Sequence, residues 1–400
     1  MKEEAARKAG FPPGEYRPAA KGEFDPQQLH GRLLREAPRR LAYRSGLSVA
    51  EVAEARSKLY EALLAALGNQ PPVAPLAADW FEPERRPLPA GSEIGSPDVA
   101  VPRSDTITVQ RVEFTTEPGV RAIGWLVIPE NKTTGTDRAT LPVHGRPTFL
   151  CVQGHTSGAH ISLGERRYTG DGEAIAGGKD YALQAARRGY NAFLLEQRNF
   201  GERMDSRPAS NRPHYDYGHP FTDERCRHQS MVALLIGRTL QGERVHDIRR
   251  AVALLEHLPT VDPRRIYLIG NSGGGTAAFY ATCTEPRVAG LIASCSFATY
   301  AETIGSIDHC SDNYLPGALE NFDMPDLAML IAPRPMVIVA GRTDPIYPLP
   351  AIQAAQNQAA RIYSDMGAKN RVGLHIGEGG HNYYPEAWDL FEQVSSLKEI

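Results

Sequence analysis

Long apolar runs are what this 400-residue sequence most plainly lacks. A helix that spans a membrane needs about 20 consecutive, predominantly apolar residues, and the longest apolar stretches, such as Met231–Gly237, are far shorter. The N-terminus is polar and carries no apolar segment of the kind found in secretory signals. We therefore expect a cytoplasmic protein without a membrane partner, with the reservation that a signal already removed would leave no trace.

Paired cysteines and an excess charge of one sign are also lacking. The five cysteines, at positions 151, 226, 283, 295 and 310, form no CxxC motif. Their odd number and wide spacing indicate reduced thiols rather than a disulfide framework. Lys plus Arg number 44 against 47 Asp plus Glu, which gives a net charge of −3. Because no basic excess is available to neutralise phosphates, we do not expect a nucleic-acid partner.

The first part of the chain has a helical pattern. Ser48 and Glu51 have the spacing of a capping box, and apolar residues at helical spacing follow as far as Gly68, a helix stop. A stretch rich in proline and glycine comes next and indicates a linker. Since 400 residues exceed what one compact core usually fills, we expect three parts: a helical extension over 1–80, a linker over 81–104 and a catalytic domain over 105–400.

From residue 105 the pattern changes to strands that alternate with helices. The β-rich segments Thr106–Phe114 and Arg121–Ile128 predict a hairpin. Short apolar segments then predict buried strands at Thr148–Val152, Ala192–Leu195, Arg265–Ile269, Gly290–Ser294, Met336–Ala340 and Val372–Ile376. Helices are expected near Asp180–Arg188, Arg238–Leu258, Gly274–Thr282, Leu349–Met366 and Pro385–Leu397. This alternation predicts an α/β fold with a mostly parallel twisted sheet and helices on both faces. Residues 199–230 are polar and predict a long loop that forms an active-site wall.

The strongest local signal is an apolar strand that runs into a glycine-serine turn and then directly into a helix. The segment is Ile266-Tyr267-Leu268-Ile269-Gly270-Asn271-Ser272-Gly273-Gly274-Gly275. Gly-x-Ser-x-Gly in this context is typical of a nucleophile elbow. Ser272 must occupy a sharp, strained turn, and glycines two before and two after it let strand and helix approach without Cβ clashes. The helix that follows directs its N–H groups at the reacting centre.

A serine hydroxyl needs an adjacent base to become a nucleophile. After such an elbow, an acid and then a histidine are expected further along the chain, each on a loop that follows a strand. Asp344 follows the expected strand Met336–Ala340, and His381 stands on a glycine loop after Val372–Ile376. Other residues fit less well because they follow no strand or lie inside one: Asp323, Asp326 and His375. The sequence thus predicts Ser272, Asp344 and His381 as catalytic residues.

An oxyanion hole needs two hydrogen-bond donors. The N–H of Gly273, which follows the nucleophile, is the first expected donor. The second is expected in the loop after Thr148–Val152, where Gly154 allows a close turn and the backbone N–H of His155 is the predicted donor. The imidazole of His155 is given no role beyond packing in that loop.

Two further residues are candidates for the substrate pocket. Arg198 follows a strand and either faces a sugar hydroxyl or carboxylate or braces its loop through Glu202 or a backbone carbonyl. His309 stands in a loop before the Asp344 strand, where it either lines the pocket or simply packs. The histidine spacings do not place two ligands on one helix face and no HExxH motif is present, so we expect neither a metal nor an organic cofactor.

From about residue 105 onward the chain resembles the α/β-hydrolase superfamily. Within it, the resemblance is to the branch of acetyl xylan esterases, cephalosporin C deacetylases and dienelactone-hydrolase-like proteins. It is carried by Gln153-Gly154-His155, Gly270-Asn271-Ser272-Gly273-Gly274-Gly275, Ala332-Pro333-Arg334-Pro335, Gly341-x-x-Asp344-Pro345 and Gly379-Gly380-His381, with further support from 196–203 and 237–251. These motifs are specific to the superfamily and much less so to a substrate. The family's oxyanion segment begins with His-Gly, whereas Gln153-Gly154 stands here.

The resemblance implies an α/β-hydrolase fold and acyl transfer by Ser272, His381 and Asp344. We expect a serine esterase for a small-molecule or carbohydrate ester of the acetyl xylan type. An amidase or peptidase on the same fold and a binding protein without turnover are the alternatives, since a fold does not determine a function. The N-terminal helices are expected either to cover the mouth of the active site or to form a homo-oligomer contact.

Overall fold

The computed structural model describes residues 26–89, 104–130, 145–204 and 223–397. At its centre is a 10-stranded sheet in the order β1-β3-β4-β6-β5-β7-β8-β9-β10, with β2 also paired to β3. The strands are β1 Ala78–Trp80, β2 Glu84–Pro87, β3 Thr106–Glu117, β4 Val120–Pro129, β5 Arg146–Val152, β6 Asn191–Leu195, β7 Val261–Asn271, β8 Val288–Ser294, β9 Met336–Gly341 and β10 Val372–Gly377.

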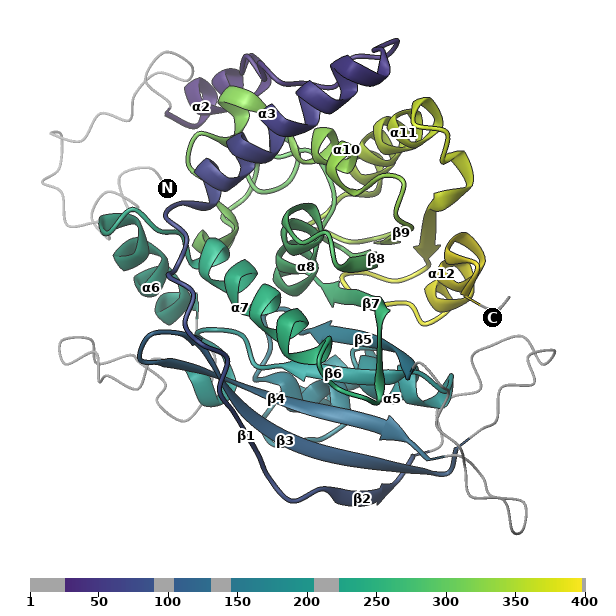
Figure 1. Cartoon of the computed structure of the whole chain (residues 1–400). Helices are drawn as coiled ribbons and strands as arrows, with labels where there is room; N and C mark the ends of the chain where they lie inside the picture. The colour runs from purple at the N-terminus through teal and green to yellow at the C-terminus, as the bar shows by residue number, and fades with distance from the viewer. Residues whose placement is uncertain (1–25, 90–103, 131–144, 205–222, 398–400) are drawn as a thin grey trace, which may run out of the picture.

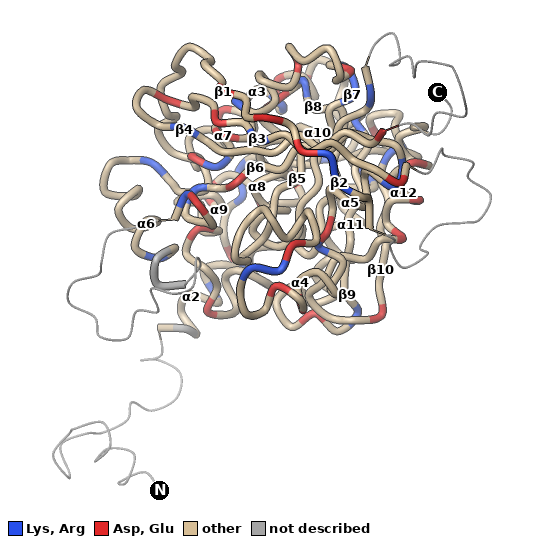
Figure 2. The backbone as a smooth tube through the Cα atoms, turned by 90° about the horizontal axis from the view of Figure 1, so that it is seen from below, with Lys and Arg blue, Asp and Glu red and all other residues tan. Residues whose placement is uncertain are grey.

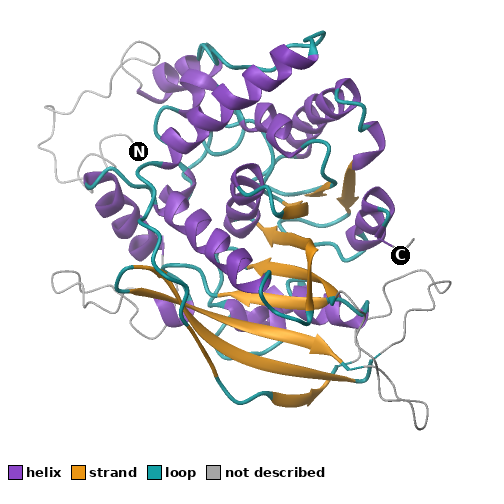
Figure 3. Cartoon of the chain, in the orientation of Figure 1, coloured by secondary structure: helices purple, strands orange, loops and turns teal. Residues whose placement is uncertain are grey.

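The sheet has a parallel half and an antiparallel half. From β6 through β5, β7, β8 and β9 to β10, every neighbouring pair is parallel. The pairs from β1 and β2 through β3 and β4 to β6 are antiparallel. Figure 3 shows the antiparallel hairpin as the long pair of strands at the bottom of the view. The carboxyl ends of all the parallel strands therefore meet at one edge, where ligand sites of such sheets form.

Helices surround the sheet, as Figure 1 shows. The α-helices are α2 Pro26–Arg35, α3 Val49–Leu67, α4 Asp171–Ala176, α5 Tyr181–Arg187, α6 Asp223–Leu235, α7 Leu240–Leu255, α8 Gly273–Thr284, α9 Ala318–Asn321, α10 Ala328–Ile331, α11 Leu349–Asp365 and α12 Ala387–Ser395. Short 3-10 turns are η1 Ala159–Leu163, η2 Gly201–Arg203, η3 Ser311–Asn313, η4 Met324–Leu327 and η5 Lys369–Arg371.

Two apolar cores lie on the two faces of the sheet. Along β7, Leu268 packs into one core while Tyr267 and Ile269 pack into the other, because successive strand side chains point to opposite faces. Helices α3, α7, α8, α10 and α11 contribute to the first core, and α5 and α12 to the second. The prediction of a sheet covered by helices on both faces is therefore confirmed.

Helix α3 begins with the expected capping box. The N–H of Glu51 donates to Ser48 Oγ at 3.3 Å, and the N–H of Ser48 donates to the Glu51 carboxylate at 2.7 Å. The helix buries Leu59, Leu63 and Leu67 in the same core as α7 and α8. The helical segment assigned to the extension thus belongs to the main core of the molecule.

The expected domain boundary near residue 104 remains a prediction, but the sheet begins before it. Strands β1 and β2 both pair with β3, so residues 78–80 and 84–87 belong to the sheet. The short polar segment Glu84–Pro87 gave no apolar alternation from which a strand is predicted. Residues 90–103 of the expected linker lie outside the described residues, as do residues 131–144, which follow the hairpin.

The expected loop over 199–230 differs from the structure at its end. Helix α6 begins at Asp223, so the last part of that segment is helical, while 205–222 lies outside the described residues. The described part of the chain contains no helix long and apolar enough to cross a membrane. Acidic and basic residues are interspersed along the described backbone, as Figure 2 shows.

Candidate active site

Ser272 occupies the sharp turn between β7 and α8. Its backbone has φ 56° and ψ −132°, a conformation that residues with a Cβ seldom adopt. The turn is held by the N–H of Ser272, which donates to the Ser294 carbonyl at 2.8 Å, and by Thr276 N–H, which donates to the Ser272 carbonyl at 2.9 Å. The strained turn that the sequence predicts at Ser272 is present.

The glycines around Ser272 allow three backbone segments to meet. A Cβ on Gly270 would lie 2.5 Å from the Gly274 carbonyl oxygen. One on Gly274 would lie 2.3 Å from the carbonyl oxygens of Val152 and Gln153. Real Cβ atoms do not approach oxygen this closely, so the strand, the helix and the loop after β5 pack together only with glycine at both positions.

Asp344 and His381 form the expected pair at the ends of β9 and β10. His381 Nδ1 lies 2.8 Å from Asp344 Oδ2. Asp344 Oδ1 accepts from the N–H groups of Ile346 at 2.8 Å and Tyr347 at 3.1 Å, which fixes the carboxylate. Because Nδ1 faces the carboxylate, Nε2 is the His381 atom left to exchange a proton with a substrate or nucleophile.

Burial would by itself raise the pKa of Asp344. The hydrogen bond and charge attraction of His381, together with the two backbone N–H groups, instead hold the pKa of this carboxyl below its ordinary value. Asp344 is therefore ionised throughout the neutral range, as an orienting acid must be. Within the described residues, the buried Nε2 of His381 has no hydrogen-bond partner.

Ser294 connects the elbow to the histidine loop. Its carbonyl accepts from Ser272 N–H, and its hydroxyl donates to the Asn382 carbonyl at 3.4 Å. Asn382 follows His381 directly. Ser294 of β8 therefore contacts both the Ser272 turn and the loop that carries His381. The three predicted catalytic residues thus stand on adjacent loops at the carboxyl edge of β7, β9 and β10.

The loop after β5 lies against the elbow, as the oxyanion prediction requires. A Cβ on Gly154 would lie 2.6 Å from the Asn271 carbonyl oxygen and 3.1 Å from Ser272 Cβ. A Cβ on Gly273 would lie 2.6 Å from His155 Cε1, so the His155 ring covers this glycine. Gly273 is the first residue of α8, where N–H groups have no partner inside the helix. The donor roles of Gly273 and His155 remain predictions.

The His155 ring is itself held by a carboxylate. His155 Nε2 lies 3.0 Å from Asp312 Oδ2. Burial would lower the pKa of His155, but the charge and hydrogen bond of Asp312 raise it to about 10. Local sequence indicates only a packing role for this ring, because Asp312 stands 157 residues further along the chain.

His309 reaches the catalytic pair through Tyr347. The ring of Tyr347 stacks on that of His381, with centroids 6.0 Å apart and an interplanar angle of 18°. His309 meets the same tyrosine edge-on, also at 6.0 Å. Burial lowers the pKa of His309, so a neutral imidazole lies beside the site. Tyr347 itself was not predicted, although it follows Asp344 by only three residues.

Arg198 is held by two buried carboxylates and a partly buried one. It makes two 2.8 Å bonds to Asp247 and lies 2.7 Å from Glu117 and 3.2 Å from Glu243. The bracing alternative therefore describes its contacts, with these three partners in place of Glu202. Arg198 also borders a surface hollow of about 520 Å³, which none of the three predicted catalytic residues lines.

Two groups of side chains in the described part of the chain have ligand atoms close enough to hold a metal ion. One consists of Cys295, Asp344 and His381, whose acid and base are already bonded to each other. The other consists of His155, Cys226, Cys310 and Asp312. Neither group has a sequence spacing typical of a metal site, so only the fold brings its members together.

Comparisons with known proteins show which solved structures share this fold. No protein-family model matches the chain. A Bacillus subtilis (strain 168) protein assigned as a hydrolase, YtaP, is 25% identical over 167 residues, which are 40% of this chain and 56% of that protein's length. A Bacteroides fragilis NCTC 9343 protein assigned as an acetyl xylan esterase matches with a TM-score of 0.64 and 15% identity, over 94% of this chain and 92% of that one.

A glucuronoyl esterase from Solibacter usitatus matches with a TM-score of 0.60 and 17% identity, over 90% of this chain and 96% of that one. At these identities the structural likeness establishes the architecture alone. The chain has the α/β-hydrolase fold of these esterases, with the Ser272 turn after β7 and the loops of Asp344 and His381 after β9 and β10.

Proposed function

We propose that this protein is a serine carboxylesterase that acts on a carbohydrate ester, such as an acetylated xylan fragment. The observation that carries the proposal is Ser272 on its strained turn after β7, at the same edge of the sheet as the hydrogen-bonded pair His381–Asp344 after β9 and β10. The names of the structural neighbours, an acetyl xylan esterase and a glucuronoyl esterase, support a carbohydrate ester as the substrate class.

The mechanism proceeds through an acyl-enzyme. Ser272 Oγ attacks the ester carbonyl while His381 Nε2 takes the hydroxyl proton, and Asp344 stabilises the imidazolium. The N–H groups of Gly273 and His155 donate hydrogen bonds to the carbonyl oxygen and stabilise the negative charge that develops on it. His381 then protonates the departing alcohol. In the second half, His381 takes a proton from water while the water oxygen attacks the acyl carbon. The bond between that carbon and Ser272 Oγ then breaks, the acid leaves, and His381 returns the proton to Ser272 Oγ.

A short substrate panel tests this proposal. It contains p-nitrophenyl acetate, butyrate and octanoate, an acetylated xylo-oligosaccharide, a uronic-acid methyl ester and an aminoacyl anilide. Each substrate is assayed with the wild type, Ser272→Ala and the control Ser395→Ala, which removes a hydroxyl from α12 on the second face of the sheet. We expect turnover of the acetyl or sugar esters that Ser272→Ala lowers by at least about 10³-fold and Ser395→Ala leaves unchanged.

Three results would contradict the proposal. Preference for the anilide would indicate an amidase or peptidase. Turnover that survives in a folded Ser272→Ala variant would exclude the mechanism. No turnover of any substrate would favour a binding protein on this fold. Circular dichroism of both variants shows whether the fold is kept.

A further inference from the structure

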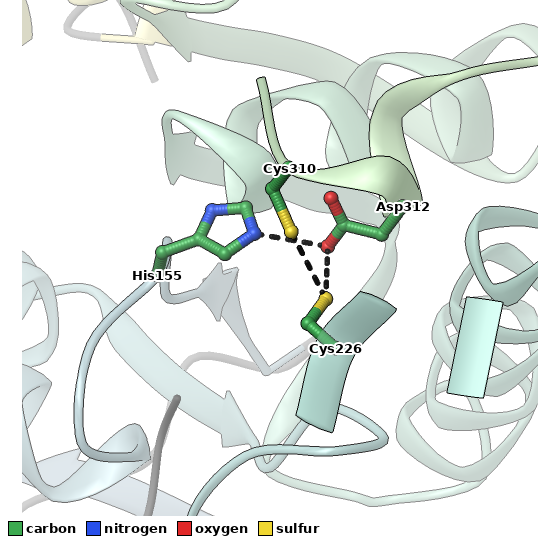
Figure 4. A group of neighbouring side chains, drawn as sticks. All are labelled: His155, Cys226, Cys310 and Asp312. Carbon is green, nitrogen blue, oxygen red and sulfur yellow. Dashed lines mark hydrogen bonds and ion pairs between the residues drawn. The ribbon is translucent and has the colours of Figure 1, made fainter. Parts of the chain in front are cut away.

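Four side chains that can ligate a metal converge beside the loop after β5, as Figure 4 shows. This loop, which carries Gly154 and His155, is called the oxyanion loop below. They are His155 Nε2, Cys226 Sγ, Cys310 Sγ and a carboxylate oxygen of Asp312, and all lie within 4.8 Å of one another. Contacts within the group are 3.0 Å for His155–Asp312, 3.2 Å for Cys226–Asp312 and 3.1 Å between the two sulfurs. Cys226 and Asp312 are buried, and the other two are partly buried.

Separate parts of the chain supply these four side chains. His155 comes from the loop after β5, Cys226 from α6, and Cys310 and Asp312 from the segment around η3. A covalent or metal link among them would tie three segments together around the oxyanion loop. The cluster is distinct from the serine, acid and histidine described above.

We propose that His155, Cys226, Cys310 and Asp312 form a structural zinc site. Two thiolates, an imidazole nitrogen and a carboxylate oxygen are donors that Zn²⁺ takes in tetrahedral sites with four protein ligands. Sulfur donors disfavour Mg²⁺ and Ca²⁺, which select oxygen. The set supplies four ligands and therefore closes the coordination sphere, as in structural rather than catalytic zinc sites.

The charges of such a site balance. A metal-bound thiol is deprotonated, so the two sulfurs and Asp312 carry three negative charges. Zn²⁺ and the fully buried guanidinium of Arg244, which is bonded to Asp312, carry three positive charges. A neutral cluster avoids the large cost of an unpaired charge in the interior.

Partners outside the four ligands orient the carboxylate. Asn313 Nδ2 donates to Asp312 Oδ1 at 2.7 Å. Arg244 is fixed in turn by the Arg198 carbonyl, at 3.2 Å from Nε and 3.1 Å from Nη2, and by the ring of Phe200, 4.6 Å from its centre. Outer partners of this kind are typical of metal-ligating carboxylates.

The cluster must open slightly to admit the ion. With zinc–ligand bonds of about 2.1–2.3 Å, donors at tetrahedral corners lie about 3.4–3.8 Å apart. The contacts of 3.0–3.2 Å therefore need to lengthen by a few tenths of an ångström. Rotation of the Cys226 and Cys310 side chains would lengthen the two contacts that involve sulfur. The His155–Asp312 contact would lengthen by a small rotation of the imidazole or the carboxylate.

Zinc at this position would fix the oxyanion loop. The His155 ring covers Gly273, and its backbone belongs to the turn that lies against Ser272. A metal bound at Nε2 sets the orientation of that ring and holds α6 and the η3 segment against it. The ion would stand apart from the ester and would take no part in the chemical steps.

The test measures metal content of the intact chain. Wild type, Ser272→Ala, Cys226→Ser, Cys310→Ser and the control Cys283→Ser are expressed with added Zn²⁺, desalted and analysed by elemental mass spectrometry. Cys283 is a buried thiol on α8, outside the cluster. We expect one zinc per chain in the wild type, Ser272→Ala and Cys283→Ser, and loss of most of it in the other two variants. Retention in Ser272→Ala separates this site from the proposed esterase activity.

Cobalt provides a second readout should the cysteine variants fail to fold. Wild-type protein stripped of metal and loaded with Co²⁺ should show sulfur-to-cobalt charge-transfer absorption and the intense visible bands of tetrahedral cobalt. Substoichiometric zinc in the wild type, together with a cobalt spectrum that lacks these bands, overturns the proposal. So does an intact mass 2 Da below that of the reduced chain with a mapped Cys226–Cys310 peptide, because a disulfide would then occupy the cluster.

Discussion

Ser272 is held in a backbone conformation, with a positive φ, that a residue with a Cβ does not favour. A positive φ at a residue with a Cβ costs on the order of 1–3 kcal/mol and persists only where the surroundings fix it. Here the fixing groups are the Ser294 carbonyl, which accepts from Ser272 N–H, and the start of α8. The strained turn places Ser272 at the carboxyl end of β7, at the edge of the sheet where the loops of Asp344 and His381 begin.

Replacing the orienting acid tests the catalytic pair directly. In Asp344→Asn the amide still accepts the N–H groups of Ile346 and Tyr347, but it no longer stabilises an imidazolium or selects the tautomer that leaves Nε2 as base. We expect kcat on the best ester to fall by about 10³–10⁴-fold, with little change in melting temperature. The control Asp308→Asn alters an exposed carboxylate in the loop before Cys310 and should behave as the wild type. A kcat within tenfold of the wild type in Asp344→Asn would remove this residue from the mechanism.

Glu196 offers a pH-dependent prediction. This carboxyl is buried at the end of β6, and burial raises its pKa to about 7, although the Ala159 N–H group acts in the opposite direction. Since the folded state favours the protonated form, its stabilising contribution is complete below the ordinary pKa of about 4.3 and is lost as the pH rises through about 7. The wild type should therefore lose on the order of 2 kcal/mol of unfolding free energy relative to Glu196→Gln between about pH 5 and about pH 8.

Denaturant unfolding of both proteins at several pH values measures that difference. Glu82→Gln is the control, because Glu82 is an exposed carboxylate between β1 and β2 and removal of its charge changes little burial energy. If the difference between the wild type and Glu196→Gln stays constant with pH, the carboxyl does not exchange its proton in this range.

At the scale of the elements, α8 packs closely against the end of β5 because Gly274 has no side-chain atoms. A Cβ at Gly274 would meet two carbonyl oxygens at 2.3 Å. In Gly274→Ala the helix must move away from β5, which carries the elbow away from the oxyanion loop. We expect esterase activity to fall at least about tenfold and stability to fall by about 1–3 kcal/mol, the usual cost of overpacking.

A glycine in another helix provides the matched control. At Gly172 in α4 an added Cβ would find only the flexible Arg166 side chain, at 3.5 Å. Gly172→Ala should therefore keep full activity and gain about 0.5–1 kcal/mol, since alanine loses less backbone entropy on folding. Equal activity losses in both variants would show that the close approach at Gly274 is not what positions the elbow.

Elements set by local sequence patterns were predicted, and elements that depend on contacts between residues far apart in the chain were not. The parallel strands, the elbow and the pair Asp344–His381 follow from local patterns, namely short apolar runs that end in glycine or acid-bearing loops. Strand β2 was missed because Glu84–Pro87 is polar and forms a strand only through pairing with β3. The cluster of His155 with Asp312 was missed because its members are brought together by the fold alone.

Arg198 illustrates the same limit for a charged residue. Its place after β6 is apparent in the sequence, but its choice of partner is not. Glu202 is four residues away, whereas the structure pairs the guanidinium with Asp247, Glu117 and Glu243 from α7 and β3. Sequence spacing favours the nearby carboxylate, whereas the packing of α7 against β3 brings the distant carboxylates into contact with Arg198.

At the scale of the whole molecule, the N-terminal helix α3 and the sheet share one core. Leu59, Leu63 and Leu67 pack in the same apolar cluster as α7, α8 and α10. Each such leucine contributes about 1.5–3 kcal/mol through burial. An appended extension would leave its own face against solvent or a partner, whereas this helix completes the first face of the sheet.

Unfolding should therefore occur in one step for α3 and the sheet together. We expect Leu63→Ala, at a side chain with 0% exposure, to lower the unfolding free energy by about 2–5 kcal/mol. The control Val49→Ala, at the 90% exposed start of the same helix, should change it by less than about 0.5 kcal/mol. Far-ultraviolet circular dichroism, tryptophan fluorescence and residual esterase activity should fall together during denaturation of both variants, with the Leu63→Ala midpoint lower by the same amount for each probe. An early helical transition that Leu63→Ala shifts, followed by an unshifted loss of activity, would instead mark α3 as a separate unit. The coincidence of the three probes is the expected outcome, because within the described residues the buried side chains of α3 pack in the core that the sheet provides.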